Sequence, residues 1–309
     1  MPVPVVSVDD AFKELLSRIE LNPARVALAS QRYNAIKNVL EAALPGKSVR
    51  QIGSFQRKTK IRPTDLSDRL DLDVVVSFGR FYNYAASGTE GTTPGRALDI
   101  LRHAIWSNDT YRVMPQAQDH PSLRIEYADQ MAIEFVPAFE DLTGQHSHGP
   151  TGPNCYIVGS TPYMWVPADY DYDAHLIGTL NSFTEGRLVP SIKMVKAYLR
   201  NVSAPLKSFH TEILVANIVP GLISEWKGKG YRYGYNHILA ATLANISKTI
   251  TVPAVLPGSF SPPVNSGLNV ATLVALGTFL ATKAAAAWQL CAANTVQGWR
   301  EFFGEPFPS

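Results

Sequence analysis

A short apolar segment that carries two acidic residues constrains this sequence more than any other feature. Along residues 70–76 two sets of positions alternate, with Leu70, Leu72, Val74 and Val76 on one side and Asp71, Asp73 and Val75 on the other. A period of two predicts a β-strand and puts both carboxylates on one face of a sheet. Such carboxylates repel each other unless a cation lies between them, and Mg²⁺ with oxygen ligands is typical beside phosphates. The alternative is a strand edge with two solvated acids.

A Gly-Ser pair, Gly53-Ser54, precedes this strand. Glycine lets the backbone approach a ligand closely, and the amides of the turn together with the Ser54 hydroxyl can hold a phosphate. The loop between the pair and the strand is basic and contains Arg57, Lys58, Lys60 and Arg62. These basic side chains could instead be solvated. Taken together, the turn, the loop and the two acids predict a site for nucleotidyl transfer.

The composition is that of a globular protein with a sizeable core. The chain has 309 residues, of which 46% are apolar and 17% charged, so two domains or one bilobal domain can form. The net charge of +2 predicts no strong attraction to nucleic acids. The two cysteines, Cys155 and Cys291, form neither zinc spacing nor a disulfide framework, and the first ten residues lack the features of a signal peptide. We therefore expect a cytoplasmic protein.

One apolar stretch, residues 268–293, resembles a membrane span in length. It is mostly Ala, Leu, Val and Thr, and Lys283 and Gln289 interrupt it. This composition favours a packed helix of a bundle over a membrane-spanning helix. No membrane partner is expected.

The pattern along the chain predicts two parts of different class. Two helices are expected within 8–44, the second of which starts at Asn22-Pro23, and another helix is expected at 96–107. Strands are expected at Tyr111–Gln116, Ser122–Tyr127 and Met131–Val136. Beyond residue 171 helices follow one another, at 172–182, 187–201, 208–224, 235–247 and 268–302. We therefore predict an α+β fold, with a mixed α/β catalytic lobe at 1–185 that includes the N-terminal helices and a helical lobe at 186–309.

A two-metal site needs a third carboxylate on a neighbouring strand. Glu134 lies in the strand expected at Met131–Val136, where Met131, Ile133 and Phe135 point one way and Glu134 the other. A metal would explain a charged side chain in so apolar a strand. Glu134 could instead face solvent, and Glu126 and Asp129 are alternatives for the third acid.

The phosphates of a nucleotide also need positive groups from the protein. Lys193 and Lys196 are three residues apart in a predicted helix and share a face. Ser208 stands where the next helix begins, so that its free amides and the helix dipole favour an anion. Phe209 could stack on a base. In the alternatives, the lysines form a solvated face, Ser208 is an N-cap and Phe209 belongs to the core.

Several of these motifs occur in the order found in cyclic GMP-AMP synthase-like enzymes. They are Gly53-Ser54, Asp71-x-Asp73, the Glu-Phe-Val-Pro-Ala run at 134–138, Lys196 and the Leu-Lys-Ser-Phe-His run at 206–210. From about residue 30 to its end the sequence resembles a bacterial member of this group, a CD-NTase of the polymerase-β superfamily. The resemblance implies a polymerase-β-like catalytic lobe completed by a helical lobe.

The resemblance also implies roles for individual residues. Asp71 and Asp73 would bind two Mg²⁺ or Mn²⁺ ions, with Glu134 at the place of the third acid, where the family usually has Asp. Ser54, Lys196 and Ser208 would hold the triphosphate, and Phe209 would stack on the base, where the family often has Tyr. Gly53 and Lys193 are further nucleotide-binding candidates from the turn and the lysine pair alone. No Cys/His zinc insertion is present, so the DNA-sensing module of the animal enzyme is not implied.

The expected function is the synthesis of a cyclic oligonucleotide second messenger in anti-phage defence. The substrates would be NTPs, namely ATP, GTP or both, or pyrimidine NTPs, and any regulatory protein partner is unspecified. Two alternatives stay open. One is a nucleotidyltransferase of the same superfamily that modifies RNA or protein, and the other is a nucleotide-binding scaffold without activity.

Overall fold

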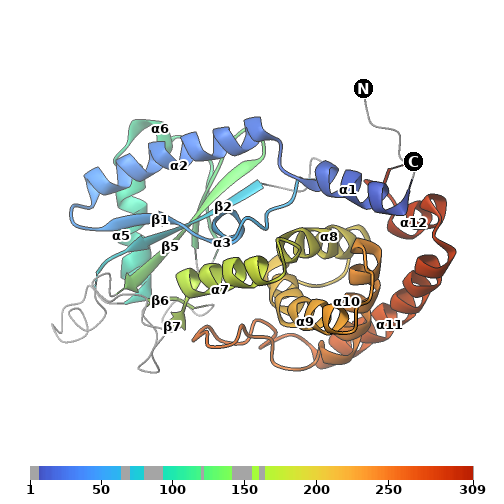
Figure 1. Cartoon of the computed structure of the whole chain (residues 1–309). Coiled ribbons are helices and arrows are strands. Elements are labelled where there is room, and N and C mark those ends of the chain that lie inside the picture. The colour runs from blue at the N-terminus through green and yellow to red at the C-terminus, as the bar shows by residue number, and fades with distance from the viewer. Residues whose placement is uncertain are drawn as a thin grey trace.

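The computed structural model describes residues 7–63, 70–79, 93–119, 122–140, 155–159 and 164–308. Figure 1 shows one half built around a β-sheet and a second half built of helices. This is an α+β architecture with a mixed sheet and a helical C-terminal lobe, which confirms the predicted fold class.

Seven strands of the described residues form one sheet. They are β1 (Ser48–Gln51), β2 (Leu70–Ser77), β3 (Gln116–Asp119), β4 (Ser122–Glu126), β5 (Met131–Glu140), β6 (Cys155–Val158) and β7 (Trp165–Ala168). The order is β1-β2-β5-β4-β3, with β6 pairing with the end of β5 and with β7. Strands β2 and β5 are parallel and the other pairs antiparallel. The two strands that carry the predicted acids are therefore direct neighbours.

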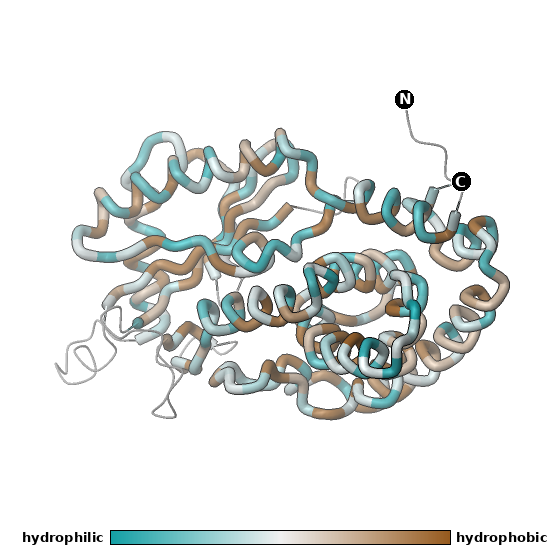
Figure 2. Tube along the Cα trace, in the orientation of Figure 1, coloured by the Kyte–Doolittle hydropathy of each residue, from teal (hydrophilic) through white to brown (hydrophobic). Residues whose placement is uncertain are grey.

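Two helices cover one face of this sheet, α2 (Pro23–Ala43) and α5 (Pro94–Trp106). Their apolar residues share a core with the alternate residues of β2, namely Leu70, Leu72, Val74 and Val76. Figure 2 shows hydrophobic stretches in the middle of the sheet, where β2 and β5 lie. Helix α2 begins where the sequence predicts, because Asn22 accepts a hydrogen bond from the Ala24 amide and Pro23 follows it. The burial of one side of β2 leaves Asp71 and Asp73 on the opposite face.

The strand predicted at Tyr111–Gln116 is wrong. A short helix, α6 (Asp109–Arg112), includes the first two residues of that range, and β3 begins only at its last residue, Gln116. The side chain of Asn108 accepts hydrogen bonds from the amides of Thr110 and Tyr111, and this cap starts the helix.

Four other elements differ from the sequence-based expectation. Strand β5 continues through Pro137 to Glu140, since β4 pairs only as far as Phe135 and β6 begins to pair at Ala138, so no ladder needs the missing amide. Strands β6 and β7 were not expected. The helix predicted at 268–302 is two helices, α11 (Val270–Ala293) and α12 (Val296–Phe303), because Asn294 adopts φ 51° and ends the first.

The helical half consists of α7 (Tyr170–Phe183), α8 (Leu188–Asn201), α9 (Ser208–Gly228), α10 (Tyr235–Thr249), α11 and α12. Helix α1 (Val8–Ile19) packs in the same core, where the ring of Phe12 lies 5.0 Å from that of Trp299 and 5.1 Å from that of Phe307. Figure 1 shows α1 beside α12. The division of the chain into two lobes between residues 185 and 186 stays a prediction. Helix α1, although N-terminal, packs in the core of the helical lobe.

By length and composition alone, helix α11 could cross a membrane. Of its most apolar 18-residue segment, 33% is buried inside the protein. Leu273, Leu276 and Leu280 pack in the helical core, as a bundle helix should. The opposite side exposes apolar residues that include Val270, Val274 and Trp288. The predicted packing is thus confirmed for one face of the helix, and the absence of a membrane partner stays a prediction.

Candidate active site

A row of three charged residues crosses the sheet on the face that α2 and α5 leave uncovered. Asp73 on β2 pairs in register with Glu134 on β5, and Glu134 pairs with Arg124 on β4. Residues paired in register project to the same face, and neighbouring strands are about 4.8 Å apart. The structure therefore brings Glu134 directly beside Asp73.

A second row lies next to the first on the same face. It consists of Asp71 on β2, Ala132 on β5 and Glu126 on β4. Two strand spacings, about 10 Å, separate the backbones of Asp71 and Glu126. The other alternative for the third acid, Asp129, lies in the turn after β4. There Arg32 donates to Asp129 Oδ1 at 2.8 Å, and this hydrogen bond lowers the pKa of Asp129. The structure places Glu134 nearer to both aspartates than either alternative.

Arg124 connects the two rows. Its Nη2 donates to Asp71 Oδ1 at 3.0 Å and its Nη1 to Glu134 Oε1 at 2.9 Å, while Nε lies 3.2 Å from Glu126 Oε1. The side chain of Arg124 is 13% exposed. A single guanidinium thus contacts carboxylates from three strands.

Asp73 lies against the turn formed by the Gly-Ser pair. The Ile52 amide donates to the Asp73 carbonyl at 2.9 Å, which ties this turn to β2. Gly53 has φ +73°, and a Cβ atom there would lie 2.0 Å from Asp73 Oδ2. Burial raises the pKa of Asp73, and within the described ranges its carboxylate makes no hydrogen bond or ion pair. A partly buried acid with a raised pKa gains from a bound cation.

The donor set of this face suits a hard divalent cation. Asp71, Asp73 and Glu134 offer carboxylate oxygens, which Mg²⁺ and Mn²⁺ prefer. Within the part of the chain that the structure describes, no three His, Cys, Asp or Glu side chains are close enough together to hold a metal. One oxygen of Asp71 and one of Glu134 accept a hydrogen bond from Arg124.

A cavity of ≈ 410 Å³ opens next to Asp71, between the sheet and helices α8 and α9. This volume falls in the range of small-molecule sites. Besides Asp71, its polar lining includes Lys60, Lys196, Arg200 and Ser208. An acid on one wall and three cations on the others fit a polyphosphate with bound metal.

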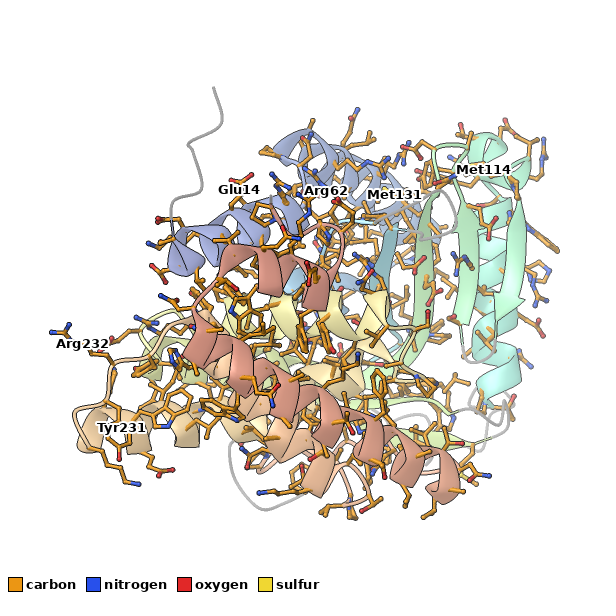
Figure 3. The ribbon with its side chains drawn as sticks, turned by 90° about the vertical axis from the view of Figure 1, so that its right-hand side faces the viewer. Glu14, Arg62, Met114, Met131, Tyr231 and Arg232 are labelled. Carbon is orange, nitrogen blue, oxygen red and sulfur yellow. The ribbon has the colours of Figure 1, made fainter. Side chains whose placement is uncertain are left out.

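Another cavity, lined by Arg187, Arg232 and His237 among others, has none of the acids of the sheet in its wall. Figure 3 places Tyr231 and Arg232 at the far end of the helical half, away from the strands. The cavity next to Asp71 is therefore the candidate active site.

A buried ion network holds Lys196 at the wall of this site. Lys196 Nζ donates to Glu212 Oε1 at 3.0 Å and to the Thr59 carbonyl at 2.9 Å, and Arg57 Nε donates to Glu212 Oε2 at 2.7 Å. Burial lowers the pKa of Lys196, although Glu212 opposes this effect. Burial alone would raise the pKa of Glu212, but Arg57 and Lys196 outweigh it and lower that pKa. Glu212 thus pairs with two buried cations next to the cavity.

Replacing Glu212 with glutamine should lower the free energy of unfolding by about 3–5 kcal/mol. The substitution leaves Arg57 and Lys196 buried without a counter-charge, which is the costly way to break a buried ion pair. Urea unfolding followed by circular dichroism measures the loss. The control is Glu225→Gln, which removes an exposed partner of Lys229 and should leave stability unchanged. Equal stability of both variants would show that Glu212 does not neutralise the two cations.

The basic loop and the lysine pair are only partly solvated. Arg57 is buried, and Lys60 lines the cavity and donates to the Asp71 carbonyl at 3.2 Å, whereas Lys58 and Arg62 are exposed. Lys193 and Lys196 are both buried, so the alternative of a solvated lysine face is wrong. Lys193 pairs with Glu20 at the end of α1 and is absent from the cavity lining, so its predicted role in nucleotide binding gains no geometric support.

The remaining predicted residues lie close to the cavity. Ser54 is buried in the short helix α3 (Gly53–Gln56). Ser208 is the first residue of α9 and lines the cavity, while Lys207 holds the cap position without a side-chain cap bond. Ser208 therefore does not act as a side-chain N-cap. Phe209 is half-buried against the helical core, and the Arg57 guanidinium lies 4.4 Å from its ring centroid, so one ring face is already covered.

Four residues of this region, Arg124, Arg200, Glu212 and Thr211, were not expected from the sequence. Arg124 has a usable signal, because it shares a strand face with Glu126 on a strand that pairs with the Glu134 strand. The only sequence signal for Glu212 is that it is a charged residue within an apolar helix. Arg200 and Thr211 have no local signal, and they become part of the site through the packing of α8 on α9.

Comparison with known proteins agrees with this geometry. Residues 6–154 match the family model of the Second Messenger Oligonucleotide or Dinucleotide Synthetase domain, SMODS. A probable cyclic nucleotide synthase of Bacillus cereus (strain VD146) is 24% identical over 292 residues, which cover 85% of this chain and 83% of the relative.

Solved structures share the fold over almost the whole chain. CdnC of E. coli MS115-1, solved with ATP, has a TM-score of 0.70 at 15% identity and covers 98% of this chain and 99% of its own. CdnC was also solved in complex with HORMA-deltaN. The Bradyrhizobium diazoefficiens CD-NTase CdnG in complex with GTP has a TM-score of 0.68 at 16% identity and covers 96% of each chain. The chain therefore carries a SMODS domain at residues 6–154, has the fold of the CD-NTases over almost its whole length and is a homologue of a probable cyclic nucleotide synthase.

Proposed function

We propose that this protein joins nucleotides from NTPs into a cyclic oligonucleotide second messenger by two-metal phosphodiester formation. One observation carries the proposal: Asp71, on the acidic face of the sheet, lines the same cavity as Lys196 and Ser208. A triphosphate in this cavity can contact cations at one end and the acids at the other. The relatives solved with ATP and GTP support purine NTPs as substrates.

The acids and the basic residues of the site have different roles in the proposed reaction. Two divalent cations, when bound, would lower the pKa of the attacking ribose hydroxyl and stabilise charge on the phosphates. Asp71 and Asp73 hold and orient these ions. Lys196 and Ser208 hold the β- and γ-phosphates and neutralise the leaving pyrophosphate.

The covalent step is a displacement at the α-phosphorus. The ribose oxygen forms a bond to phosphorus, the bond to pyrophosphate breaks, and the hydroxyl proton passes to a Glu134 carboxylate oxygen. A second transfer of the same kind closes the ring. Most of the catalytic effect then comes from positioning and charge stabilisation, as is usual in such transfers.

Incubation of the purified protein with all four NTPs and Mg²⁺ or Mn²⁺ tests the proposal. Mass spectrometry should find a phosphatase-resistant cyclic product that forms without a polymer acceptor. Labelled nucleotide that appears only on added RNA or protein would favour the alternative transferase. NTP binding without any product would favour the scaffold without activity.

The biological setting is part of the same proposal. The cyclic product would act as a signal in anti-phage defence, in the cytoplasm. A relative was solved in complex with HORMA-deltaN, and a regulatory protein partner of that kind would suit this chain too. Phage protection by a strain that carries the wild-type gene, and its loss with the inactive Asp71 and Asp73 double variant, tests this setting.

Glu134→Gln should keep NTP binding and lose most turnover. The amide has the shape of the carboxylate but cannot accept the hydroxyl proton, a function worth about 10²–10⁴-fold in rate. Single-turnover kinetics together with ATP binding by calorimetry separate the two effects. Glu126→Gln is the matched control, because Glu126 lies on the same face one strand further away. Normal turnover of Glu134→Gln with loss in Glu126→Gln would assign the third acid to Glu126.

A further inference from the structure

Arg124 lies among the acids of the candidate metal site. It is in the same cross-strand row as Glu134 and Asp73, on β4, the strand next to β5. Its two terminal nitrogens reach Asp71 Oδ1 at 3.0 Å and Glu134 Oε1 at 2.9 Å. These contacts join β2 to β5 across the place where the metal-binding acids converge.

The planar guanidinium suits this bridging position. It offers several N–H donors in a rigid fork, and hydrogen bonds between such donors and carboxylates are the strong, charge-assisted kind. Without a cation between them, Asp71 and Glu134 would repel each other and turn apart. Arg124 therefore keeps both carboxylates on the sheet face when no metal is present.

The same contacts oppose metal binding. A carboxylate oxygen that accepts a hydrogen bond from a guanidinium is a poor ligand for a second cation, and the two positive charges repel each other. Glu126, whose Oε1 lies 3.2 Å from Arg124 Nε, provides another partner for the guanidinium. Arg124 can keep that partner while it releases Asp71 or Glu134.

We propose that Arg124 is a positioning residue that occupies the space between Asp71 and Glu134 in the metal-free enzyme and that a divalent cation must displace it from at least one of them. This inference rests on the proposed function, because it assumes that these acids bind the catalytic metal. It predicts competition between one side chain and the ion. It also provides a reason why no three acids are close enough together to hold a metal in the part of the chain that the structure describes.

To test the proposal, the affinity of the NTP-free protein for Mn²⁺ is measured by calorimetry or electron paramagnetic resonance. Arg124→Gln should bind Mn²⁺ about tenfold more tightly than the wild type, since the ion no longer replaces hydrogen bonds to a charged group. A role in folding alone would not raise metal affinity. Arg124→Lys keeps a cation but loses the fork, so its affinity should lie between the two, and it provides a second variant should the glutamine variant unfold.

Arg32→Gln is the matched control. Arg32 is also a partly buried arginine paired with an acid, Asp129, at 2.8 Å, but it lies on α2, away from the acidic face. Its replacement should leave Mn²⁺ affinity at the wild-type value. An equal gain in both arginine variants would overturn the proposal, because the effect would then come from net charge.

Further outcomes separate this inference from the proposed function. Unchanged or weaker Mn²⁺ binding by Arg124→Gln, together with loss of binding in the Asp71 and Asp73 double variant, would overturn the competition and leave the metal site intact. Wild-type Mn²⁺ binding in that double variant would instead refute the metal site and the competition together.

Discussion

Replacing both Asp71 and Asp73 with asparagine should abolish product formation while the fold stays intact. The two carboxylates share one face of β2 and are the central ligands of the proposed metal site. Loss of metal stabilisation should remove several kcal/mol from the transition state, which corresponds to roughly 10³-fold or more in rate. The measurement is the rate of cyclic product formation from ATP and GTP.

The fold should tolerate this change for a physical reason. Burial already raises the pKa of Asp73 and so disfavours its charged form, and a neutral amide of the same shape removes that cost. Asp71→Asn keeps an oxygen that can accept from Arg124. The control is Asp99→Asn, which changes an exposed acid on α5 that pairs with Arg102. Near-normal activity in a folded double variant would reject the site assignment.

Gly53→Ala should reduce the rate about 10²-fold, the loss expected when a catalytic group is misplaced by about 1 Å. The added Cβ would lie 2.0 Å from Asp73 Oδ2, so either the turn or the carboxylate must shift. The left-handed φ of +73° adds a strain of about 1–2 kcal/mol for any residue with a side chain. Steady-state kinetics and Mn²⁺ affinity should both show the loss.

Gly178→Ala is the control for this substitution. Gly178 lies exposed in the middle of α7, where a Cβ would meet nothing within 4 Å, and alanine favours a helix there. Its activity should equal that of the wild type, with unchanged or slightly higher stability. Full activity of Gly53→Ala would show that the turn does not position Asp73 closely.

Local patterns were sufficient to predict the elements that carry the acids. The alternation around Asp71 and Asp73 predicted a strand with one buried face, and the structure has Leu70, Leu72, Val74 and Val76 in the core. The same reasoning placed Glu134 on the side of its strand opposite Ile133, and Ile133 is fully buried. A local cap competed with such a pattern at Asn108, which starts a short helix that includes the first two residues of the strand expected at Tyr111–Gln116.

Contacts between segments that are distant in the chain could not be predicted from the sequence. Lys193 and Lys196 share a helix face, but one pairs with Glu20 and the other with Glu212, and no local rule separates them. The bridge from Arg124 to Asp71 joins positions 53 residues apart, and the ion pair between Arg57 and Glu212 joins positions 155 apart. Such pairs depend on strand order and helix packing.

By itself the sequence determined which residues of each strand share a face of the sheet, since side-chain direction in a strand follows from its period of two. It also determined where helices α2 and α11 begin, since Asn22 and Asn269 cap them with their own side chains. Only the tertiary structure decided that Glu134 is the acid beside Asp73, that Arg124 lies between the acids and that Glu212 holds Lys196. Those choices require the register between strands and the approach of α8 to α9, and burial of apolar surface across the whole molecule sets both.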